Sequence, residues 1–306
     1  MDLLLEYRNC PSCGKNDFTV LFESNMKDGD FREGIDTVYM LPGGKYGRHV
    51  RCRDCHLIYV NPIEDEGRIN EGYSQRESID ASIIRRSRLS AAKSQLRLIR
   101  KHNRGTNLLD TGCAEGFFLF NASKEGYTTK GIELSQGAAA YAREEFGLDV
   151  EAGYFEESQF PENCFDVVTL WQVLEHVPCP HTILKEVHRI LKPGGLVTVS
   201  TPDIGGIPAR IFGRRWWNIR RVHINQFTTE TLRSILENAG FKNVASTSYW
   251  ECISLSMLLI PILKYLKVYE PLKALFYPSS ILARIMDRIR LIYPAKLDNC
   301  VMLGFK

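Results

Sequence analysis

Two cysteine pairs near the N-terminus have the spacing of metal ligands. Cys10 pairs with Cys13 and Cys52 with Cys55, each as C-x-x-C. Such a pair turns back on itself and presents two thiolates to one ion, and two pairs complete a closed tetrahedral site. The sequence therefore predicts one structural zinc ion, with simple burial of the thiols as the alternative. The gap between the pairs is longer than in an ordinary zinc ribbon.

A glycine-containing loop follows a short apolar stretch and reads D-x-G-x-x-x-G from Asp110 through Gly112 to Gly116. Glycine lets a backbone turn sharply and approach a ligand closely. Glu133 stands at the end of the next expected strand, where an acid can accept hydrogen bonds from both hydroxyls of a ribose. The loop lacks the G-x-G-x-x-G fingerprint of dinucleotide sites. By itself it also fits an ordinary turn between a strand and a helix.

Alternating strands and helices are expected after Gly105, and they must position these residues. Apolar stretches predict strands at 107–112, 128–134, 149–155, 165–173, 195–202, 241–249 and 300–306. Helical periodicity and capping residues predict helices at 117–126, 135–147, 181–195 and 228–241, with Ser135 as an N-cap. This alternation indicates an α/β fold, a parallel sheet covered by helices on both faces.

Several motifs, in order, resemble those of the class I S-adenosylmethionine-dependent methyltransferase family. They are LLDTGCAEG, KGIELS, FDVVTLWQVLEHVPCP, LKEVHRILKPGGLVTVSTPD and HINQFTTETLRSILENAGF, and together they cover about residues 105–250. The resemblance implies a Rossmann-like methyltransferase sheet of seven mostly parallel strands with the last strand antiparallel. Ala114 departs from the family pattern, which often has glycine there. The segments CPSCG and CRDCHLIYVNP resemble a zinc-binding module that precedes some sugar methyltransferases.

The resemblance also assigns the S-adenosylmethionine site. Asp110, Gly112 and Gly116 shape the methionine and ribose pocket, and Glu133 holds the ribose. By position, Tyr154 and Phe155 flank the adenine, and Gln172 faces the methionine end.

An acceptor oxygen benefits from a base that takes its proton. Glu175 and His176, after the fourth expected strand, and His223, after the fifth, are the candidates, because parallel sheets bind ligands at the carboxyl ends of their strands. The alternative is that Glu175 and His176 only brace the pocket.

The arginine–tryptophan segment, residues 210–223, has arginines around Trp216 and Trp217 and no acid. Arginine forks suit phosphate oxygens, which favours an anionic acceptor such as a nucleotide sugar or a phospholipid-linked glycan. The alternative is a solvated loop with two core tryptophans. The apolar, proline-broken stretch 253–293 is expected to roof the site or rest on a membrane surface, unless it packs on the sheet. Within it, Ile281, Ile285, Ile289 and Ile292 are expected on one face of a helix.

The whole chain has 306 residues, 44% of them apolar and 25% charged, with a formal net charge of +3. This near balance does not indicate a nucleic-acid partner. Nine cysteines without a secretory leader favour a reducing cytoplasm, with the inner face of a membrane as a second location. The expected division is a strand-poor zinc module at 1–70, a methyltransferase domain at 71–250, and a helical extension at 251–306 that ends in the last sheet strand. The sequence leaves the oligomeric state open.

These features together predict methyl transfer to an oxygen of a small-molecule or saccharide acceptor, including phosphate-bearing or lipid-linked ones. A sugar C-methyltransferase is one alternative, although those enzymes usually have a longer C-terminal domain. A second is an RNA methyltransferase that uses the zinc module, although no N-P-P-[YF] motif is present. A third is a zinc-stabilised binding protein with a vestigial cofactor fold, which the intact Asp110 and Glu133 disfavour.

Overall fold

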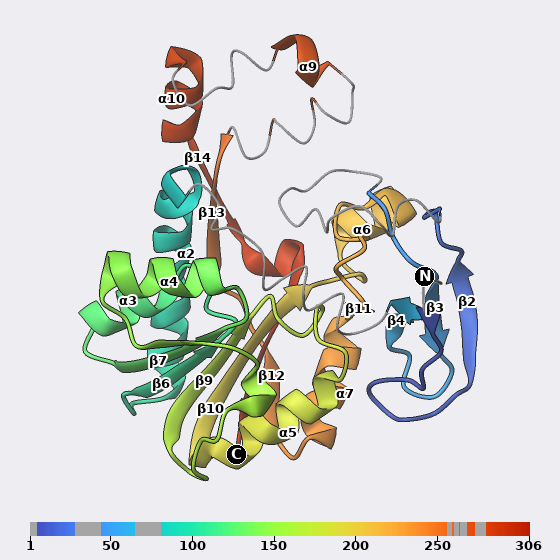
Figure 1. Ribbon diagram of the computed structural model, residues 1–306, viewed down its shortest axis with the longest axis horizontal. Coiled ribbons are helices and arrows are strands. Elements are labelled where there is room, and N and C mark those ends of the chain that lie inside the picture. Colours follow the sequence, from blue (N-terminus) through green and yellow to red (C-terminus); the bar gives the residue numbers. More distant parts are fainter. Residues whose placement is uncertain are drawn as a thin grey trace.

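The central sheet has seven strands in the order β12-β15-β10-β9-β6-β7-β8 (Figure 1). The computed structural model describes residues 5–27, 44–64, 81–255, 259, 263, 268–272 and 280–306. The strands are β6 (Asn107–Thr111), β7 (Thr128–Glu133), β8 (Val150–Ala152), β9 (Phe165–Trp171), β10 (Leu191–Pro202), β12 (Lys242–Ser246) and β15 (Asn299–Phe305). Only β15 runs antiparallel to its neighbours, β10 and β12. The predicted Rossmann-like methyltransferase fold is confirmed.

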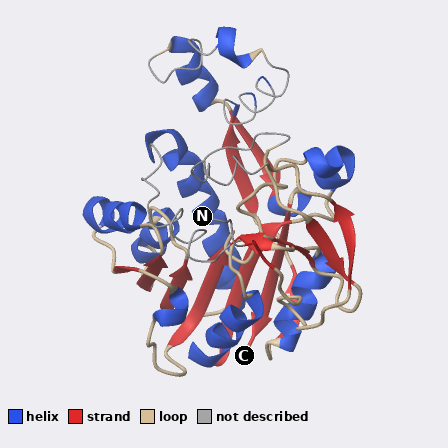
Figure 2. Cartoon of the chain, turned by 45° about the vertical axis from the view of Figure 1, so that its right-hand side comes forward, coloured by secondary structure: helices blue, strands red, loops and turns tan. Residues whose placement is uncertain are grey.

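Helices cover both faces of this sheet (Figures 1 and 2). On one face, α2 (Ala81–His102), α3 (Phe117–Lys124) and α4 (Gln136–Phe146) bury apolar side chains in a common core. On the other face, α5 (Pro180–Ile190) and α7 (Thr229–Asn238) do the same. Ser135 caps α4 as predicted, since its hydroxyl accepts from the Ala138 N–H at 3.2 Å. Helix α5 ends earlier than predicted because Leu191 already pairs with Phe165 in the sheet.

The N-terminal segment contains more strand than the sequence suggested. Strands β2 (Phe18–Phe22), β3 (His49–Cys52) and β4 (Ile58–Val60) form an antiparallel sheet, and β1 (Leu5–Glu6) pairs with β5 (Ile63–Glu64). The prediction of a strand-poor module is wrong, because glycines and cysteines masked these short pairings. The fourth strand of the sheet is β11 (Asn225–Gln226), which comes from the methyltransferase part of the chain. The expected boundary near residue 70 lies outside the described residues.

The C-terminal part carries a second small sheet, of β13 (Trp250–Ser254) and β14 (Arg290–Pro294). The described helices here are α9 (Tyr269–Leu272) and α10 (Ile281–Arg288). The prediction of one helical face through Ile289 and Ile292 is wrong, because α10 ends at Arg288 and Ile292 pairs with Cys252 in the sheet. Pro261 and Pro278 lie outside the described residues. Among the described helices, none has the length and apolar character needed to cross a bilayer.

Candidate functional site

The loop between β6 and α3 has three residues in left-handed backbone conformations. Their φ angles are 66° at Gly112, 47° at Ala114 and 78° at Gly116. A Cβ on Gly112 would lie 2.8 Å from Val173 Cγ2, and one on Gly116 would lie 2.9 Å from Ala142 Cβ. Both glycines are therefore required by space as well as by conformation. A left-handed conformation costs a non-glycine residue about 1–2 kcal/mol, and Ala114 bears that cost where the family often has glycine.

The Glu133 carboxylate is fixed beside this loop. Its Oε2 accepts from the Ala114 N–H at 2.8 Å, and its Oε1 accepts from the Ser135 N–H at 2.8 Å. These bonds hold the side chain where β6 and β7 end. A carboxylate offers about four acceptor positions, so one oriented in this way is suited to receive a pair of ribose hydroxyls.

Asp110 lies buried at the end of β6. Its Oδ1 accepts from the Thr169 hydroxyl at 2.6 Å. Burial raises the pKa of this carboxyl to about 8 and outweighs the lowering effect of the Thr169 hydrogen bond, while the charge of Glu133 adds a smaller raising contribution. The Asp110 carboxyl is therefore largely protonated at neutral pH.

The remaining expected cofactor residues follow the ends of β8 and β9. Phe155 is buried in the core, at the start of a 3-10 turn that follows β8, and Tyr154 is half-buried directly before it. Gln172 has a φ of 59°, and its Nε2 donates to Ser200 Oγ at 3.0 Å and to Asn299 Oδ1 at 3.1 Å. Its amide thus reaches across β10 towards β15. The structure brings Asp110 and Glu133 to one loop and turns Gln172 to the other side.

The three acid–base candidates converge, as their expected places at the strand ends suggested. Ligating atoms of Glu175, His176 and His223 all lie within 4.8 Å of one another. His176 Nε2 is 3.9 Å from Glu175 Oε1, and the two imidazole centroids are 4.7 Å apart. Glu175 is only 1% exposed, and burial raises its pKa to about 8. Its carboxyl is therefore largely neutral at pH 7.

The two histidines differ in what their ring nitrogens contact. His223 Nδ1 bonds to the Asn218 carbonyl at 2.9 Å, and its Nε2 accepts from Arg220 Nε and Nη2 at 3.1 and 2.9 Å. Burial, followed by the charge of Arg220, lowers the pKa of His223 well below its usual value. His176 Nδ1 donates to the Val222 carbonyl at 2.8 Å, so the lone pair of its neutral ring is on Nε2. Its geometry suits a base, and that of His223 suits a brace.

The arginine–tryptophan segment is neutralised in part by distant acids. Trp216 is fully buried, and the indole N–H groups of Trp216 and Trp217 donate to Asp298 at 3.2 and 3.3 Å. Arg221 makes a two-pronged ion pair with Glu64 at 2.6 and 2.8 Å. The segment itself contains no acid, as its sequence shows, and these carboxylates come from other parts of the chain.

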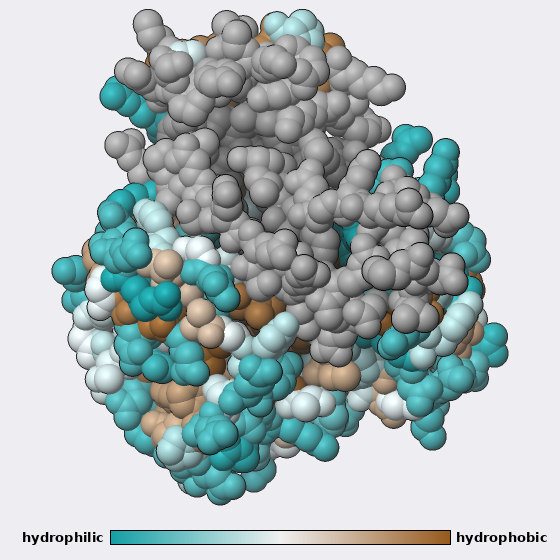
Figure 3. Space-filling view, viewed as in Figure 1, coloured by the Kyte–Doolittle hydropathy of each residue, from teal (hydrophilic) through white to brown (hydrophobic). Residues whose placement is uncertain are grey.

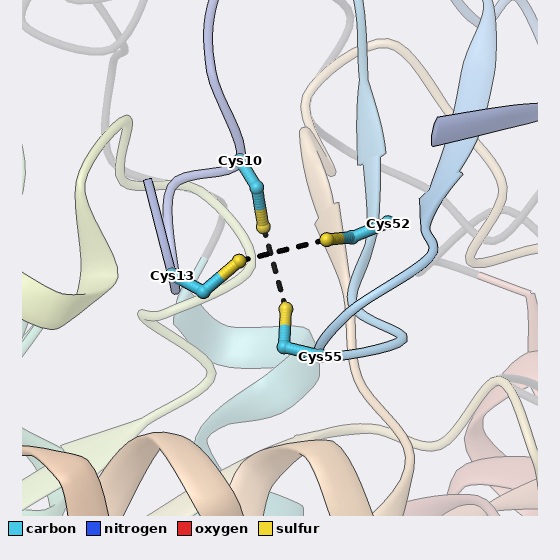
Figure 4. Close-up of side chains that lie close together, drawn as sticks. All are labelled: Cys10, Cys13, Cys52 and Cys55. Carbon is cyan, nitrogen blue, oxygen red and sulfur yellow. Dashed lines mark hydrogen bonds between the residues drawn. The ribbon is translucent and has the colours of Figure 1, made fainter. Parts of the chain in front are cut away.

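The four predicted metal ligands meet at one point (Figure 4). Cys10 Sγ is 3.4 Å from Cys55 Sγ, and Cys13 Sγ is 3.5 Å from Cys52 Sγ, far beyond a disulfide bond. All four sulfurs lie within 4.8 Å of one another, which brackets the spacing of about 3.8 Å in a tetrahedral zinc–thiolate site. A hydrogen bond from Cys10 lowers the pKa of Cys55 to about 5, so one ligand is readily ionised. The residues fit a structural zinc ion.

Two further residues contact the loop that contains Glu175, and no sequence pattern points to this contact for either of them. The buried Asn225 accepts from Arg8, and its backbone N–H donates to the Glu175 carbonyl at 3.1 Å. Asn225 lies within the family-like string HINQF, which gave no hint of its contacts, and Arg8 lies in no pattern at all.

Comparison with known proteins points to one family. The sequence model of a family described as "Methyltransferase domain" matches residues 83–246. A ubiquinone biosynthesis O-methyltransferase of Pseudomonas paraeruginosa is 36% identical over 103 residues, which are 32% of this chain and 44% of that protein. A probable S-adenosylmethionine-dependent methyltransferase of Mycolicibacterium smegmatis is 29% identical over 140 residues, 45% of this chain and 52% of that protein. The chain thus spans about half the length of these relatives, or less.

The fold also matches solved structures. A SAM-dependent methyltransferase from Archaeoglobus fulgidus aligns with a TM-score of 0.50 at 18% identity. The alignment covers 74% of this chain and 98% of that one.

Proposed function

Since the chain belongs to the class I S-adenosylmethionine-dependent methyltransferases, we propose that it methylates an oxygen of a small-molecule or saccharide acceptor. The observation that carries this proposal is His176, whose Nε2 lone pair lies at the carboxyl end of the sheet beside the neutral acid Glu175. The name of the Pseudomonas relative, an O-methyltransferase, supports oxygen as the acceptor atom.

The cofactor residues divide the binding of S-adenosylmethionine among them. Glu133 holds the ribose hydroxyls, and Gly112 and Gly116 let the backbone approach the methionine part. Asp110, at the base of the loop, is placed to receive the cationic amino group and would ionise as it does so. The bound sulfonium supplies an activated methyl group.

The acceptor side needs alignment and a proton acceptor. As the methyl carbon leaves sulfur and bonds to the acceptor oxygen, the hydroxyl proton passes to His176 Nε2. Glu175, being neutral, can hydrogen-bond within this region without placing an uncompensated charge in a dry pocket. His223, with Arg220 on its Nε2 and Asn218 on its Nδ1, holds the ring of His176 in place.

An anionic, lipid-linked acceptor is favoured by the surface of α6 (Ile207–Phe212). Ile207 is 62% exposed and Ile211 is 70% exposed, and the side chains of Arg210, Arg214 and Arg215 are exposed around them. No acid occurs in the sequence between Asp203 and Glu230. Protruding apolar groups among exposed cations suit the headgroup region of an anionic bilayer. Helix α6 follows the carboxyl end of β10, so such a surface lies on the acceptor side (Figure 1).

Other described residues also expose apolar side chains, among them Ile292 at 65% and Trp250 at 58%. Figure 3, which has the same view as Figure 1, shows hydrophilic residues over much of the described surface. Its place after the carboxyl end of β10, beside exposed arginines, favours α6 as the face that meets a membrane or an anionic substrate.

The test is transfer of a labelled methyl group. The purified protein, incubated with methyl-labelled S-adenosylmethionine and separate lipid, water-soluble and RNA fractions, is expected to label the lipid fraction in a base-stable ether. Label in the water-soluble fraction alone would remove the lipid-linked part of the proposal. Label on carbon or in RNA would replace it with one of the alternative activities.

A further inference from the structure

We infer that Arg8 and Asn225 are positioning residues, through which the cysteine-rich N-terminal module sets the place of Glu175 and His176. The inference rests on the proposed function, in which His176 receives the acceptor proton. It assigns to the module a task at the acceptor end of the site.

Asn225 ties β11 to the loop after β9. Its Nδ2 donates to the Leu174 carbonyl at 3.1 Å and to the Val177 carbonyl at 2.7 Å, and its backbone N–H donates to the Glu175 carbonyl at 3.1 Å. Both protons of the side-chain amide are thus used on one loop. Because the residue is fully buried, water cannot replace these bonds, and the backbone on either side of His176 is fixed by one side chain.

Arg8 joins that loop to the N-terminal module. Its Nη1 donates to the Pro178 carbonyl at 2.9 Å, and its Nη2 donates to Asn225 Oδ1 at 3.3 Å. The Nε donates to the Val60 carbonyl at 3.2 Å, within β4. One guanidinium therefore connects β4, β11 and the loop that carries His176. A planar fork with several fixed donors makes this connection in a way that a lysine cannot reproduce.

The cysteine cluster anchors Arg8 from the other side. Cys10, two residues further along the chain, is one of the four ligands. Tyr59 lies opposite Asn225 in the pairing of β4 with β11, and the Arg8 guanidinium lies 5.5 Å from the centre of its ring. Cys10, Tyr59 and Leu174 also share one buried core. Order at the metal site is thereby transmitted to the His176 loop.

The cofactor loop is held by different contacts. The Gly112 and Cys113 N–H groups donate to the Ile132 carbonyl at 2.8 and 3.1 Å, and Ala114 donates to Glu133. Because these bonds come from β7, a change at Arg8 is expected to affect the acceptor end and to leave S-adenosylmethionine affinity nearly unchanged.

The experiment compares Arg8→Lys and Arg8→Ala with Arg48→Lys in the full chain. Arg48 is the matched control, since its Nε also donates to a backbone carbonyl, that of Asn61, but within the module. Three quantities are measured: the titration of the His176 imidazole by NMR, amide hydrogen exchange over residues 172–179, and the affinity for S-adenosylmethionine by calorimetry.

Both Arg8 variants are expected to shift the His176 titration midpoint and to speed exchange in this loop by about tenfold or more, as loss of a charged hydrogen bond implies. Added guanidinium ion, at a concentration that leaves Arg48→Lys unchanged, should restore the Arg8→Ala signals, and ammonium ion should not. Normal His176 signals in Arg8→Lys, or equal effects from Arg48→Lys, would overturn the inference. If the unaltered protein does not bind S-adenosylmethionine, that result would instead overturn the proposed function.

Discussion

At the scale of single residues, the proposed acid–base chemistry would be divided among three neighbouring side chains. Burial keeps Glu175 neutral, Arg220 donates to the Nε2 of His223, and the Nε2 of His176 lies 3.9 Å from Glu175 Oε1. Identical residue types therefore take different tasks, because their hydrogen-bond partners differ.

Replacing His176 with Gln is expected to slow methyl transfer by about 10²–10⁴-fold, the usual contribution of a positioned base. The affinity for S-adenosylmethionine should stay the same, because the cofactor residues lie on β6 and β7. The effect is measured as the initial rate of methyl transfer from the labelled cofactor to the fraction that accepts label. His188→Gln, on α5 against Phe241, is the control and should retain full activity. A fully active His176→Gln protein would exclude this residue as the base.

The pH dependence of stability provides a test of Glu175. Its pKa is about 8 when folded and near 4.5 when unfolded, so the folded state binds the extra proton between these values. The free energy of unfolding therefore falls as pH rises from about 4.5 to 8. In Glu175→Gln this part of the fall should disappear, which leaves the variant more stable than the unaltered protein at pH 8 by at least about 1 kcal/mol. Urea unfolding at pH 5 and pH 8 measures the free energy of unfolding of both proteins. If that free energy falls with pH equally in both, the raised pKa assigned to Glu175 is wrong.

At the scale of secondary-structure elements, the sequence pattern predicted the strands and helices that have a regular apolar pattern or a capping residue. It missed those that have neither. The central strands β9, β10 and β15 are long and mostly apolar, and Ser135 and the glycines mark helix ends, so these were predictable. Strand β11 is two polar residues long and has no periodicity. The start of strand β14 was mistaken for helix because Ile289 and Ile292 continue the apolar spacing of α10, although Ile292 is exposed in the strand.

The site residues were likewise predictable only where a local pattern marks them. Cys10 and its three partners, and the loop from Asp110, were predictable because local spacing defines them. The pairing of Arg221 with Glu64 and that of Trp216 with Asp298 join residues far apart in sequence, so only the fold reveals them.

Helix α6 supports a prediction at this scale. The double variant Arg214→Ala/Arg215→Ala should lose binding to phosphatidylglycerol vesicles, because each arginine near an anionic surface contributes about 1 kcal/mol. Flotation with anionic and neutral vesicles measures binding. The matched control is Lys101→Ala/Arg104→Ala, two exposed residues before β6 at the opposite end of the sheet. If the unaltered protein does not float with anionic vesicles, α6 is not a membrane surface.

At the scale of the whole molecule, the N-terminal module and the methyltransferase domain are continuous. Strand β11 completes the sheet of the module, and Cys10 and Cys52 share a core with β9 and β10. A change at the cysteine cluster is therefore expected to affect the methyltransferase domain as well as the N-terminal module.

Metal removal tests that continuity. Purified protein should contain one zinc per chain, and Cys52→Ser should lower that content and the melting temperature together, because metal binding is coupled to folding. Cys164→Ser, outside the cluster, should change neither. Metal analysis and thermal unfolding measure the two effects. Less than about half an equivalent of zinc, or unchanged zinc in Cys52→Ser, would contradict a closed four-cysteine site.

The most direct test of the central claim is calorimetric titration with S-adenosylmethionine. We expect binding at one site per chain, weakened by about 1–3 kcal/mol in Glu133→Ala, where the ribose hydroxyls lose a charged partner. Glu144→Ala, an exposed acid on α4, should bind as the unaltered protein does. Tight binding of NAD without any S-adenosylmethionine signal, or equal affinity in Glu133→Ala, would contradict the assignment of this loop as the methyl-donor site.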